Sequence, residues 1–427
     1  MKKHTPAEFR GTAFGWFLFA LAALFYCYEY LLRIAPSVMC TELMQYYSLN
    51  ATGFGNLFAV YYYIYTPMQI PVGLLLDRYG SRFLLTFACL ICAIGTFVFS
   101  VSHILFLAQI GRFLVGLGSA FAFVGVLKVS SIWLPPERFG MVAGLTTALG
   151  MVGAMFGGNI MANLVQEIGW QQTLYGSGIF GLILTAVMGH YLRDSRKVLT
   201  EEVVVQVEKK VTFASLFVNS IKLLRKPQML LVAFIGGVLY TSLSVFAELW
   251  GIPYLHQAKG FTTQMSAALM SLVFLGWAIG GPIVGYISDK MNDRRLPLVV
   301  GSVLGACVIT AIIYENGWPS YLMALLLFLF GVFSSAQNLC FAIAKESTVQ
   351  ALTGSAIALT NMFVMLMGAL LQPIVGYILD MHWNGTVYDG VHYYSNEGFQ
   401  YALLFLPVIY FSSALLAMLL KKRYIRE

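Results

Sequence analysis

The sequence predicts an all-α membrane protein with twelve transmembrane helices in two six-helix pseudo-repeats, and three observations predict this fold class. First, 59% of the 427 residues are hydrophobic and only 11% are charged, whereas a soluble domain carries about 25% charged residues. Second, apolar runs of about 20 residues, the length that crosses a bilayer, recur along the chain. Third, one short motif occurs at the same place in both halves. A water-soluble globular protein is therefore excluded.

Each expected helix corresponds to one long apolar run. In the first half, the runs lie at 13–39, 51–75, 83–102, 104–133, 140–165 and 170–192. In the second half, the runs lie at 227–255, 264–288, 296–314, 319–344, 352–380 and 399–420. We therefore divide the chain into an N-terminal bundle, a linker and a C-terminal bundle, at 1–192, 193–226 and 227–427.

The basic residues decide the orientation. An even number of spans puts both termini on one side, and if that side is cytoplasmic, the inner loops and ends hold 22 of the 26 Lys and Arg residues. The outer loops then hold only Lys259, as the positive-inside rule requires. The net charge of +7 is thus a topology signal and gives no support for nucleic-acid binding. We expect a monomeric protein of the bacterial inner membrane with both termini cytoplasmic.

The linker 193–226 is the longest polar connection. It contains eight basic residues and the amphipathic stretch FASLFVNSIKLLRK, which we expect to lie along the inner membrane surface. A plain connection between the bundles is the simpler interpretation, and a regulatory or partner-binding role is the alternative.

No motif for a cofactor, a metal or an enzyme reaction is found in the sequence. Cys89 and Cys92 form a C-x-x-C inside an apolar run, without the second pair of ligands that a zinc site needs. Metal-ligand clusters, phosphate-binding loops and nucleophile elbows are missing. We therefore expect no cofactor, no metal and no enzymatic activity.

The inner turn after the second span of each half carries the same pattern. The first half reads GLLLDRYGSR at 73–82 and the second reads GYISDKMNDRR at 285–295. Each begins with Gly-x-x-x-Asp followed by a cation. This match at equivalent positions supports two parallel six-span repeats.

The loop at 73–82 resembles the signature G-x3-D-[RK]-x-G-x-[RK] of the major facilitator superfamily. RFLVGLG at 112–118 is similar to an R-x3-G-x-G element of that superfamily, and WLPPERFG at 133–140 is similar to the sequence that closes its fourth helix. The resemblance implies a secondary transporter whose halves rock about a site at the bilayer midplane.

Spans one and two also resemble particular branches of the superfamily. YLLRIAPSV at 30–38 and YYYIYTPMQIPVG at 61–73 look like the anion:cation symporters and the phagosomal nutrient transporters of intracellular bacteria. Many of the former place an acid directly before the span-one arginine, whereas this chain has Leu32 there.

The charged inner loop is expected to act as a gate. Asp77 ends an inner helix, where its carboxylate can accept hydrogen bonds from a facing helix N-terminus and pair with a cation, bridging the halves when the inner side is closed. Gly73 and Gly80 are expected to allow close approach and a tight turn. A solvated loop with interchangeable charges is the alternative. The predicted gate residues are Gly73, Asp77, Arg78, Gly80, Arg82, Arg112 and Asp289.

Charged side chains inside the spans are functional candidates, because each costs a few kcal/mol to insert. The chain has five, which are Glu29, Arg33, Arg112, Lys128 and Glu248. At 1.5 Å per residue, Arg33 lies about 9 Å below the outer end of the first span and Glu248 about 10 Å below that of the seventh. They occupy similar depths in the first helix of their halves.

Glu29 and Arg33 share a helix face at i, i+4 and can pair. Either the pair is structural, or Arg33 binds a substrate carboxylate while Glu29 carries a proton. Glu248 has no cation within a turn on its own helix, so it is a proton carrier or makes a cross-helix bond. Substrate binding is assigned to Arg33, Tyr30, Tyr61, Tyr65, Glu248, Gln337 and Asn361, with helix packing as the alternative. Proton coupling is assigned to Glu29 and Glu248.

Arg112 and Lys128 cannot both face one cavity. They are 16 residues apart and point about 160° away from each other on a straight helix. We expect Lys128 to extend toward the inner surface and rank Arg112 as a gate or structural tie ahead of a direct ligand.

The leading hypothesis is proton-coupled uptake of a small carboxylate-bearing nutrient, an amino acid or a related solute. Arg33 would hold the carboxylate and Glu248 an ammonium group. An organic or sugar acid symporter is the alternative, and a non-transporting receptor of the same fold is another. A drug or siderophore exporter is disfavoured because span five lacks the Gly-Pro of the exporter signature. The partners are thus a small solute, protons and the lipid bilayer.

Overall fold

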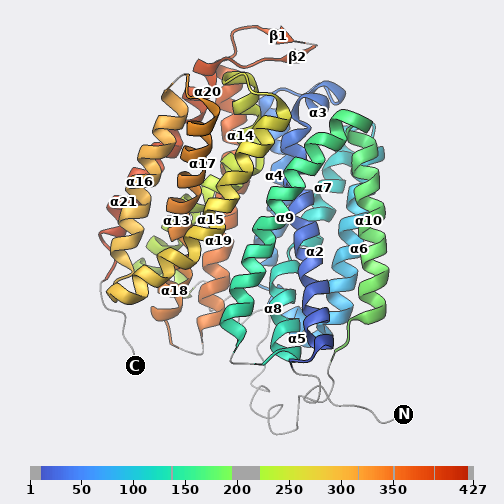
Figure 1. The fold of residues 1–427 in the computed structure, drawn as a ribbon, viewed down its shortest axis with the longest axis vertical. Helices are drawn as coiled ribbons and strands as arrows, with labels where there is room; N and C mark the ends of the chain where they lie inside the picture. Colours follow the sequence, from blue (N-terminus) through green and yellow to red (C-terminus); the bar gives the residue numbers. More distant parts are fainter. Residues whose placement is uncertain are drawn as a thin grey trace.

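The fold is described from a computed structural model, which describes residues 11–135, 138–194, 222–315, 317–349, 352–388 and 390–421. Figure 1 shows two helical bundles side by side, one from each half of the chain. Within the described residues the only strands are β1 (Val387–Tyr388) and β2 (Val391–His392), an antiparallel hairpin at one end of the molecule. The expected linker lies almost entirely outside the described residues, as does most of its amphipathic stretch.

The bundles are built from helices close to the expected spans. The N-terminal bundle contains α2 (Ala13–Val38), α3 (Cys40–Tyr46), α4 (Ala51–Met68), α5 (Val72–Tyr79), α6 (Ser81–Val101), α7 (Leu105–Ser119), α8 (Ala122–Trp133), α9 (Phe139–Ile168) and α10 (Trp170–Tyr191). The C-terminal bundle contains α13 (Pro227–Thr241), η2 (Ser242–Trp250), α14 (Gly251–Pro253), η3 (Tyr254–Ala258), α15 (Thr263–Met291), α16 (Arg295–Tyr314), α17 (Ser320–Ser334), η4 (Ser335–Gln337), α18 (Asn338–Glu346), α19 (Thr353–Met381), α20 (Asn396–Leu403) and α21 (Phe405–Ala417).

Eleven helical segments of the described chain are long and apolar enough to cross a membrane. The expected second span is not among them, because α4 carries four tyrosines at 61–65 that lower its hydropathy. It is nevertheless a central helix, packed against α7 and α19. The all-α membrane fold is therefore as predicted, and its second span is the least apolar.

Several expected spans are interrupted rather than continuous. The fourth span of the first half divides into α7 and α8, and its counterpart in the second half divides into α17 and α18 around the 3₁₀ turn η4. The seventh span passes through the π-helical segments η2 and η3. Breaks at corresponding places in two repeats are typical of transporter binding sites, and π segments are frequent at functional sites.

The glycine-rich fifth span, α9, packs closely on α2. A methyl group placed on Gly153 would lie 2.8 Å from the backbone of Cys27, so the two backbones touch. The halves meet where α4 lies against α19, α9 against α15 and α2 against η2. The side chains of α2 and η2 therefore face each other at the centre of the molecule.

We call one end of the molecule inner, because we expect it to face the cytoplasm, and the opposite end outer. The inner end carries the last turns of α5, α8 and α18, and the outer end carries α3, α20 and the hairpin (Figure 1). Gly11 donates a backbone hydrogen bond to Trp133 at the end of α8. The start of α2 is therefore fixed at the inner end.

Candidate substrate site

Arg33 lies at the centre of a buried polar cluster. Its side chain is 2% exposed, and its Nε and Nη2 atoms donate to Glu29 Oε1 at 2.9 and 2.5 Å. Nε also donates to Tyr61 Oη at 3.1 Å, and the Tyr61 hydroxyl donates to the same Glu29 oxygen at 2.5 Å. The i, i+4 pair is therefore formed, and α4 closes it from the side.

The C-terminal bundle contributes the other side of the cluster. Arg33 Nη1 donates to Tyr240 Oη on α13 at 3.3 Å and lies 3.7 Å from Glu248 Oε1 on η2. Tyr62 of α4 donates to Glu248 Oε2. Glu248 thus takes the cross-helix pairing that was one of its two alternatives. Arg33 is contacted from both halves.

Tyrosine rings surround the guanidinium of Arg33. Its Cζ atom lies 4.4 Å from the ring centroid of Tyr30, 5.4 Å from that of Tyr61 and 5.2 Å from that of Tyr65. Each ring attracts the cation through its negative face, with a strength of about 0.5–2 kcal/mol. Aromatic faces and hydroxyls together hold Arg33 in one position.

Two carboxylate oxygens in this cluster receive no hydrogen bond. Glu29 Oε2 and Glu248 Oε1 are buried and accept no hydrogen bond, whereas buried polar atoms in proteins normally accept one; Glu248 Oε1 has only the ion-pair contact with Arg33 at 3.7 Å. With both acids ionised, they and Arg33 carry a net charge of −1. The site therefore has spare acceptor capacity, for protons or for the donor groups of a ligand.

Sequence reasoning missed two residues of the cluster, Tyr62 and Tyr240. Tyr62 follows Tyr61 and so points about 100° away from it on the helix, toward the other half. Tyr240 lies in an apolar run of α13 and is 4% exposed. The available signal was an aromatic hydroxyl two turns before the intramembrane acid Glu248.

Gln337 and Asn361 were also predicted to contact substrate. Asn361 Nδ2 instead donates to Gln69 Oε1 at 2.8 Å and joins α19 to the end of α4. Gln337 is buried in the 3₁₀ turn η4 with Nε2 unpaired. Neither forms a hydrogen bond with Arg33, so the helix-to-helix alternative describes Asn361 here.

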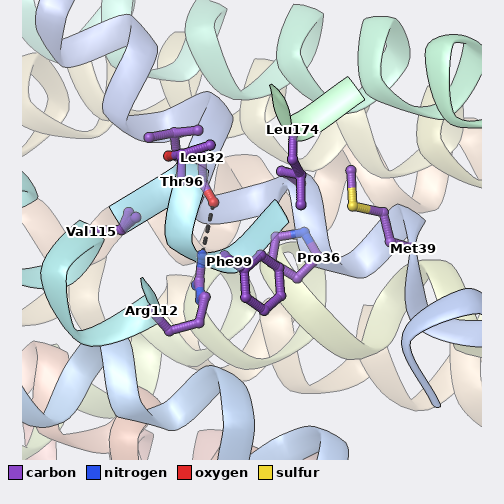
Figure 2. A pocket seen from close by; sticks show the side chains of 9 residues that line it. Leu32, Pro36, Met39, Thr96, Phe99, Arg112, Val115 and Leu174 are labelled. Atoms are coloured by element: carbon purple, nitrogen blue, oxygen red, sulfur yellow. Dashed lines mark hydrogen bonds between the residues drawn. The ribbon is translucent and has the colours of Figure 1, made fainter. Parts of the chain in front are cut away.

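Arg112 is a structural tie in this state. Its Nη1 donates to the carbonyl oxygen of Leu32 at 3.0 Å (Figure 2). That carbonyl lacks its usual helical donor, because residue i+4 is Pro36, which has no N–H. The guanidinium also stacks over Phe58 at 4.9 Å, and the side chain lines a cavity of about 10 Å³, room for about one water molecule.

The expected inner gate does not bridge the halves in this structure. Asp77 Oδ1 pairs with Lys128 Nζ at 2.6 Å, and Lys128 belongs to α8 of the same bundle. In the second half, Asp289 pairs with Arg294, which also contacts Glu346 Oε1 at 3.1 Å. In this state a cation of the same bundle is in contact with Asp77, and the predicted bridge, which belongs to the state with the inner side closed, stays a prediction.

The remaining loop residues have local roles. Gly80 ends α5 with φ +86°, a conformation that favours glycine. Arg82 Nη2 donates to the Gly189 carbonyl at 2.6 Å and so holds the end of α10, and Arg78 lies over the ring of Tyr79. A methyl group placed on Gly73 meets no atom within 4 Å. The close approach expected at Gly73 is therefore not made in this state.

Comparison with known proteins identifies the fold and its relatives. The family model described as Major Facilitator Superfamily matches residues 18–373. The probable galactarate/D-glucarate transporter GudP of Escherichia coli (strain K12) is 25% identical, over 84% of this chain and 86% of the relative. The probable sulfoacetate transporter SauU of Cupriavidus necator is 24% identical, over 67% and 68%.

Solved structures share the architecture. A bacterial homologue of the human lysosomal transporter Spinster, in an inward-facing and unoccupied conformation, superposes with a TM-score of 0.78 at 14% identity, covering 95% of this chain and 97% of that one. The nucleoside transporter NupG gives a TM-score of 0.71 at 13% identity, covering 96% of this chain and 99% of that one. At these identities the likeness concerns the fold alone.

Proposed function

Because the chain belongs to the Major Facilitator Superfamily, and is a multi-pass membrane transporter and not an enzyme, we propose that it takes up a small carboxylate-bearing solute by proton-coupled alternating access. The observation that carries the proposal is the buried guanidinium of Arg33, contacted from both bundles. A site that both halves share is where a substrate can affect their relative position.

Arg33 anchors the substrate carboxylate in this proposal. Its planar fork suits a carboxylate better than a lysine would, and Glu29 occupies it in the empty site. A proton on Glu29 neutralises that competitor and weakens its hold on Arg33. Proton binding and substrate binding are thus favourable together, which is the basis of symport.

Glu248 favours a substrate that also carries an ammonium group. Its Oε1 and Glu29 Oε2 receive no hydrogen bond, so a cationic donor group has acceptors ready. An amino acid or a related zwitterion adds no net charge to the cluster, which carries −1 with both acids ionised and is neutral with Glu29 protonated. This is the first candidate for the substrate class.

The relatives favour a second candidate, a sugar acid or another organic acid. Their names describe galactarate/D-glucarate and sulfoacetate transporters. Substrate hydroxyls can donate to the same free carboxylate oxygens, and Arg33 binds the acid group in either case. Each additional carboxylate adds negative charge to the cluster, so a diacid requires at least one of Glu29 and Glu248 to be protonated.

Uptake into proteoliposomes tests the proposal. An imposed inward proton gradient should drive accumulation of a labelled amino acid or a labelled sugar acid, and competition with unlabelled solutes should identify the class. Accumulation that is independent of the proton gradient would contradict proton coupling. Binding with no accumulation supports the receptor alternative, and export in intact cells contradicts uptake.

Substitution of Arg33 tests the anchor. Hydrogen bonds to charged groups contribute about 1.5–3 kcal/mol, or roughly 10- to 150-fold in affinity. Arg33→Ala should weaken binding by this range, and Arg33→Lys by less, because the charge remains but the fork is lost. The exposed Arg138 provides the control Arg138→Ala. If Arg33→Ala binds the substrate as tightly as the wild type, the ion pair of Arg33 with Glu29 has a structural role only.

A further inference from the structure

Asp380 joins the two bundles at the outer end. It lies in the last turn of α19, and its carboxylate accepts hydrogen bonds from the backbone N–H groups of Ala51 at 3.1 Å and Thr52 at 2.8 Å. The Thr52 hydroxyl donates to it as well, at 2.5 Å. A residue of the C-terminal bundle thus caps the first turn of α4, a helix of the N-terminal bundle.

Tyr394 completes this contact from the loop after the hairpin. Its hydroxyl donates to Asp380 Oδ1 at 2.5 Å and lies 2.9 Å from the N–H of Ala51, which donates to it. The backbones touch one turn earlier, where a methyl group placed on Gly376 would lie 2.2 Å from the Ala51 carbonyl oxygen. At Gly376 the backbones of α4 and α19 are therefore in direct contact.

A helix N-terminus is a favourable place for a carboxylate. The first N–H groups of a helix have no partner within it, and the helix dipole adds a partial positive charge there. Asn50, the N-cap of α4, satisfies only Gly53. Asp380 supplies acceptors for the two N–H groups that precede it, so its charge is matched even though no cation is involved in the contacts described here.

The opposite end of the same helix pair behaves differently. The segments α4 and α5 run from the outer to the inner end, and α19 runs back from inner to outer (Figure 1). At the inner end the corresponding acid is Asp77, and it pairs with Lys128 of its own bundle. Among the described residues, the innermost side-chain hydrogen bond between the bundles is that of Asn361 with Gln69.

We propose that Asp380 and Tyr394 form an outer latch that holds the outer side closed in this state and must release Ala51 and Thr52 before that side opens. The proposal rests on alternating access, as in the proposed function, but not on the identity of the substrate. When the latch releases, water takes over the hydrogen bonds to the Asp380 carboxylate. Water can reach this carboxylate because it is only partly buried. The latch can therefore reform in every cycle.

A cross-linking assay reads the state of the outer side directly. Gln264 of α15 donates to Gln166 of α9 across the bundles at the outer end, so a cysteine pair at these positions should cross-link with a short bifunctional thiol reagent when the outer side is closed. The six native cysteines are replaced in a background that retains transport. This readout needs no substrate, so it does not depend on the substrate proposal.

Asp380→Asn should lower the cross-linking yield several-fold and slow transport, because one amide oxygen replaces two charged acceptors. Tyr394→Phe, which removes a single hydroxyl, should act in the same direction and more weakly. Glu397→Gln is the matched control, an exposed acid at the same end that should change neither quantity.

Wild-type cross-linking and transport in both Asp380→Asn and Tyr394→Phe would overturn the latch. A thermal melt in detergent separates gating from folding. A lower yield with the wild-type melting temperature supports the latch, and a lower yield that merely follows the loss of folded protein in both variants contradicts it. Altered cross-linking with wild-type transport would show that the contact affects closure of the outer side without being needed in the transport cycle, and would also overturn the proposal.

Discussion

At the scale of single residues, the binding capacity of the central site depends on which buried polar atoms lack hydrogen-bond partners. Arg33 serves Glu29, Tyr61 and Tyr240 at once, while one oxygen of each glutamate receives no hydrogen bond. Removing one partner of a buried ion pair typically costs about 3–5 kcal/mol, because a buried charge is left alone. Conservative substitutions that preserve shape are therefore the informative ones here.

Tyr62→Phe should change the response to pH more than it changes stability. The substitution removes only the hydroxyl that donates to Glu248 Oε2, which leaves the ionised carboxylate poorly solvated and favours its protonated form. If Glu248 takes part in proton coupling, uptake should then extend to higher pH. The measurement is uptake rate against pH in proteoliposomes.

Tyr63 gives the matched control for this experiment. It is the adjacent tyrosine on the same helix, 50% exposed on the outside of the bundle, and Tyr63→Phe should leave the pH profile as in the wild type. An unchanged profile in Tyr62→Phe would remove Glu248 from the proton pathway and keep it as a tie between the halves.

At the scale of helices, the conformation of helix ends and breaks decides which segments are held rigidly. α5 ends at Gly80 with a positive φ, and the next helix begins at once with Ser81, whose hydroxyl donates to Asp194 at 2.8 Å. The turn therefore has one conformation. Gly73, the second residue of α5, has none of these constraints.

Gly80→Ala and Gly73→Ala should have opposite effects on stability. At Gly80 a side chain would have to adopt φ +86° and ψ +153°, a conformation essentially restricted to glycine that costs about 1–3 kcal/mol, and its Cβ would lie 2.3 Å from Asp194 Oδ2. At Gly73 the space is open, and in this first turn of α5 alanine should be favoured over glycine by less than the roughly 1 kcal/mol found in helix interiors. Thermal unfolding in detergent measures both. A destabilised Gly73→Ala would show that the glycine is needed for another conformational state.

The exposed pair of Asp77 and Lys128 should contribute less than about 1 kcal/mol to stability. Asp77→Asn is therefore expected to fold normally and still to transport slowly, if Asp77 contacts a helix N-terminus of the other bundle when the inner side closes. The measurement is transport rate together with cysteine labelling at the inner side, which should increase.

The charge swap Asp77→Lys with Lys128→Asp separates the two roles of Asp77. It restores the ion pair within the bundle but places a cation where a carboxylate would face the helix N-terminus. Transport should remain low in the swapped protein. Recovery to the wild-type rate would show that the local ion pair is the whole function of Asp77.

At the scale of the whole molecule, the distribution of charge predicts which end faces the cytoplasm. The hairpin residue Tyr388 is 67% exposed at the outer end, and Met291, at the end of α15, is 47% exposed at the inner end. In intact cells, a membrane-impermeant maleimide should label Tyr388→Cys and spare Met291→Cys, with both labelled after the cells are opened. The reverse pattern would invert the orientation.

Much of the fold could be predicted from the sequence, because a membrane span is a local property of about 20 apolar residues. The breaks could not be predicted in the same way. The passage from α13 into the π segment η2 runs through Thr241 and Ser242, and that from α17 into η4 through Ser334 and Ser335, residues that also occur within regular helices of this chain. Their geometry depends on packing against α19 and α15, which local composition does not contain.

Part of the candidate site could likewise be predicted from residues close together in the sequence. The spacing of Glu29 and Arg33 predicts their pairing, and the similar depths predicted for Arg33 and Glu248 agree with their separation of 3.7 Å in the structure. The partners Tyr62 and Tyr240 come from other helices and were missed. Which of several buried tyrosines turns its hydroxyl toward an acid is a matter of helix rotation in the bundle.

The sequence by itself determined the class of molecule, the twelve expected spans, the two repeats and the central arginine, because hydropathy, charge bias and helical spacing are written in neighbouring residues. Only the tertiary structure decided that Arg112 holds the Leu32 carbonyl freed by Pro36, that Asp77 pairs within its own bundle and that Asp380 caps α4 from the other. These contacts join residues 51 to 329 positions apart. The packing of the helices, and not the local composition, decides which polar groups form hydrogen bonds or ion pairs with each other.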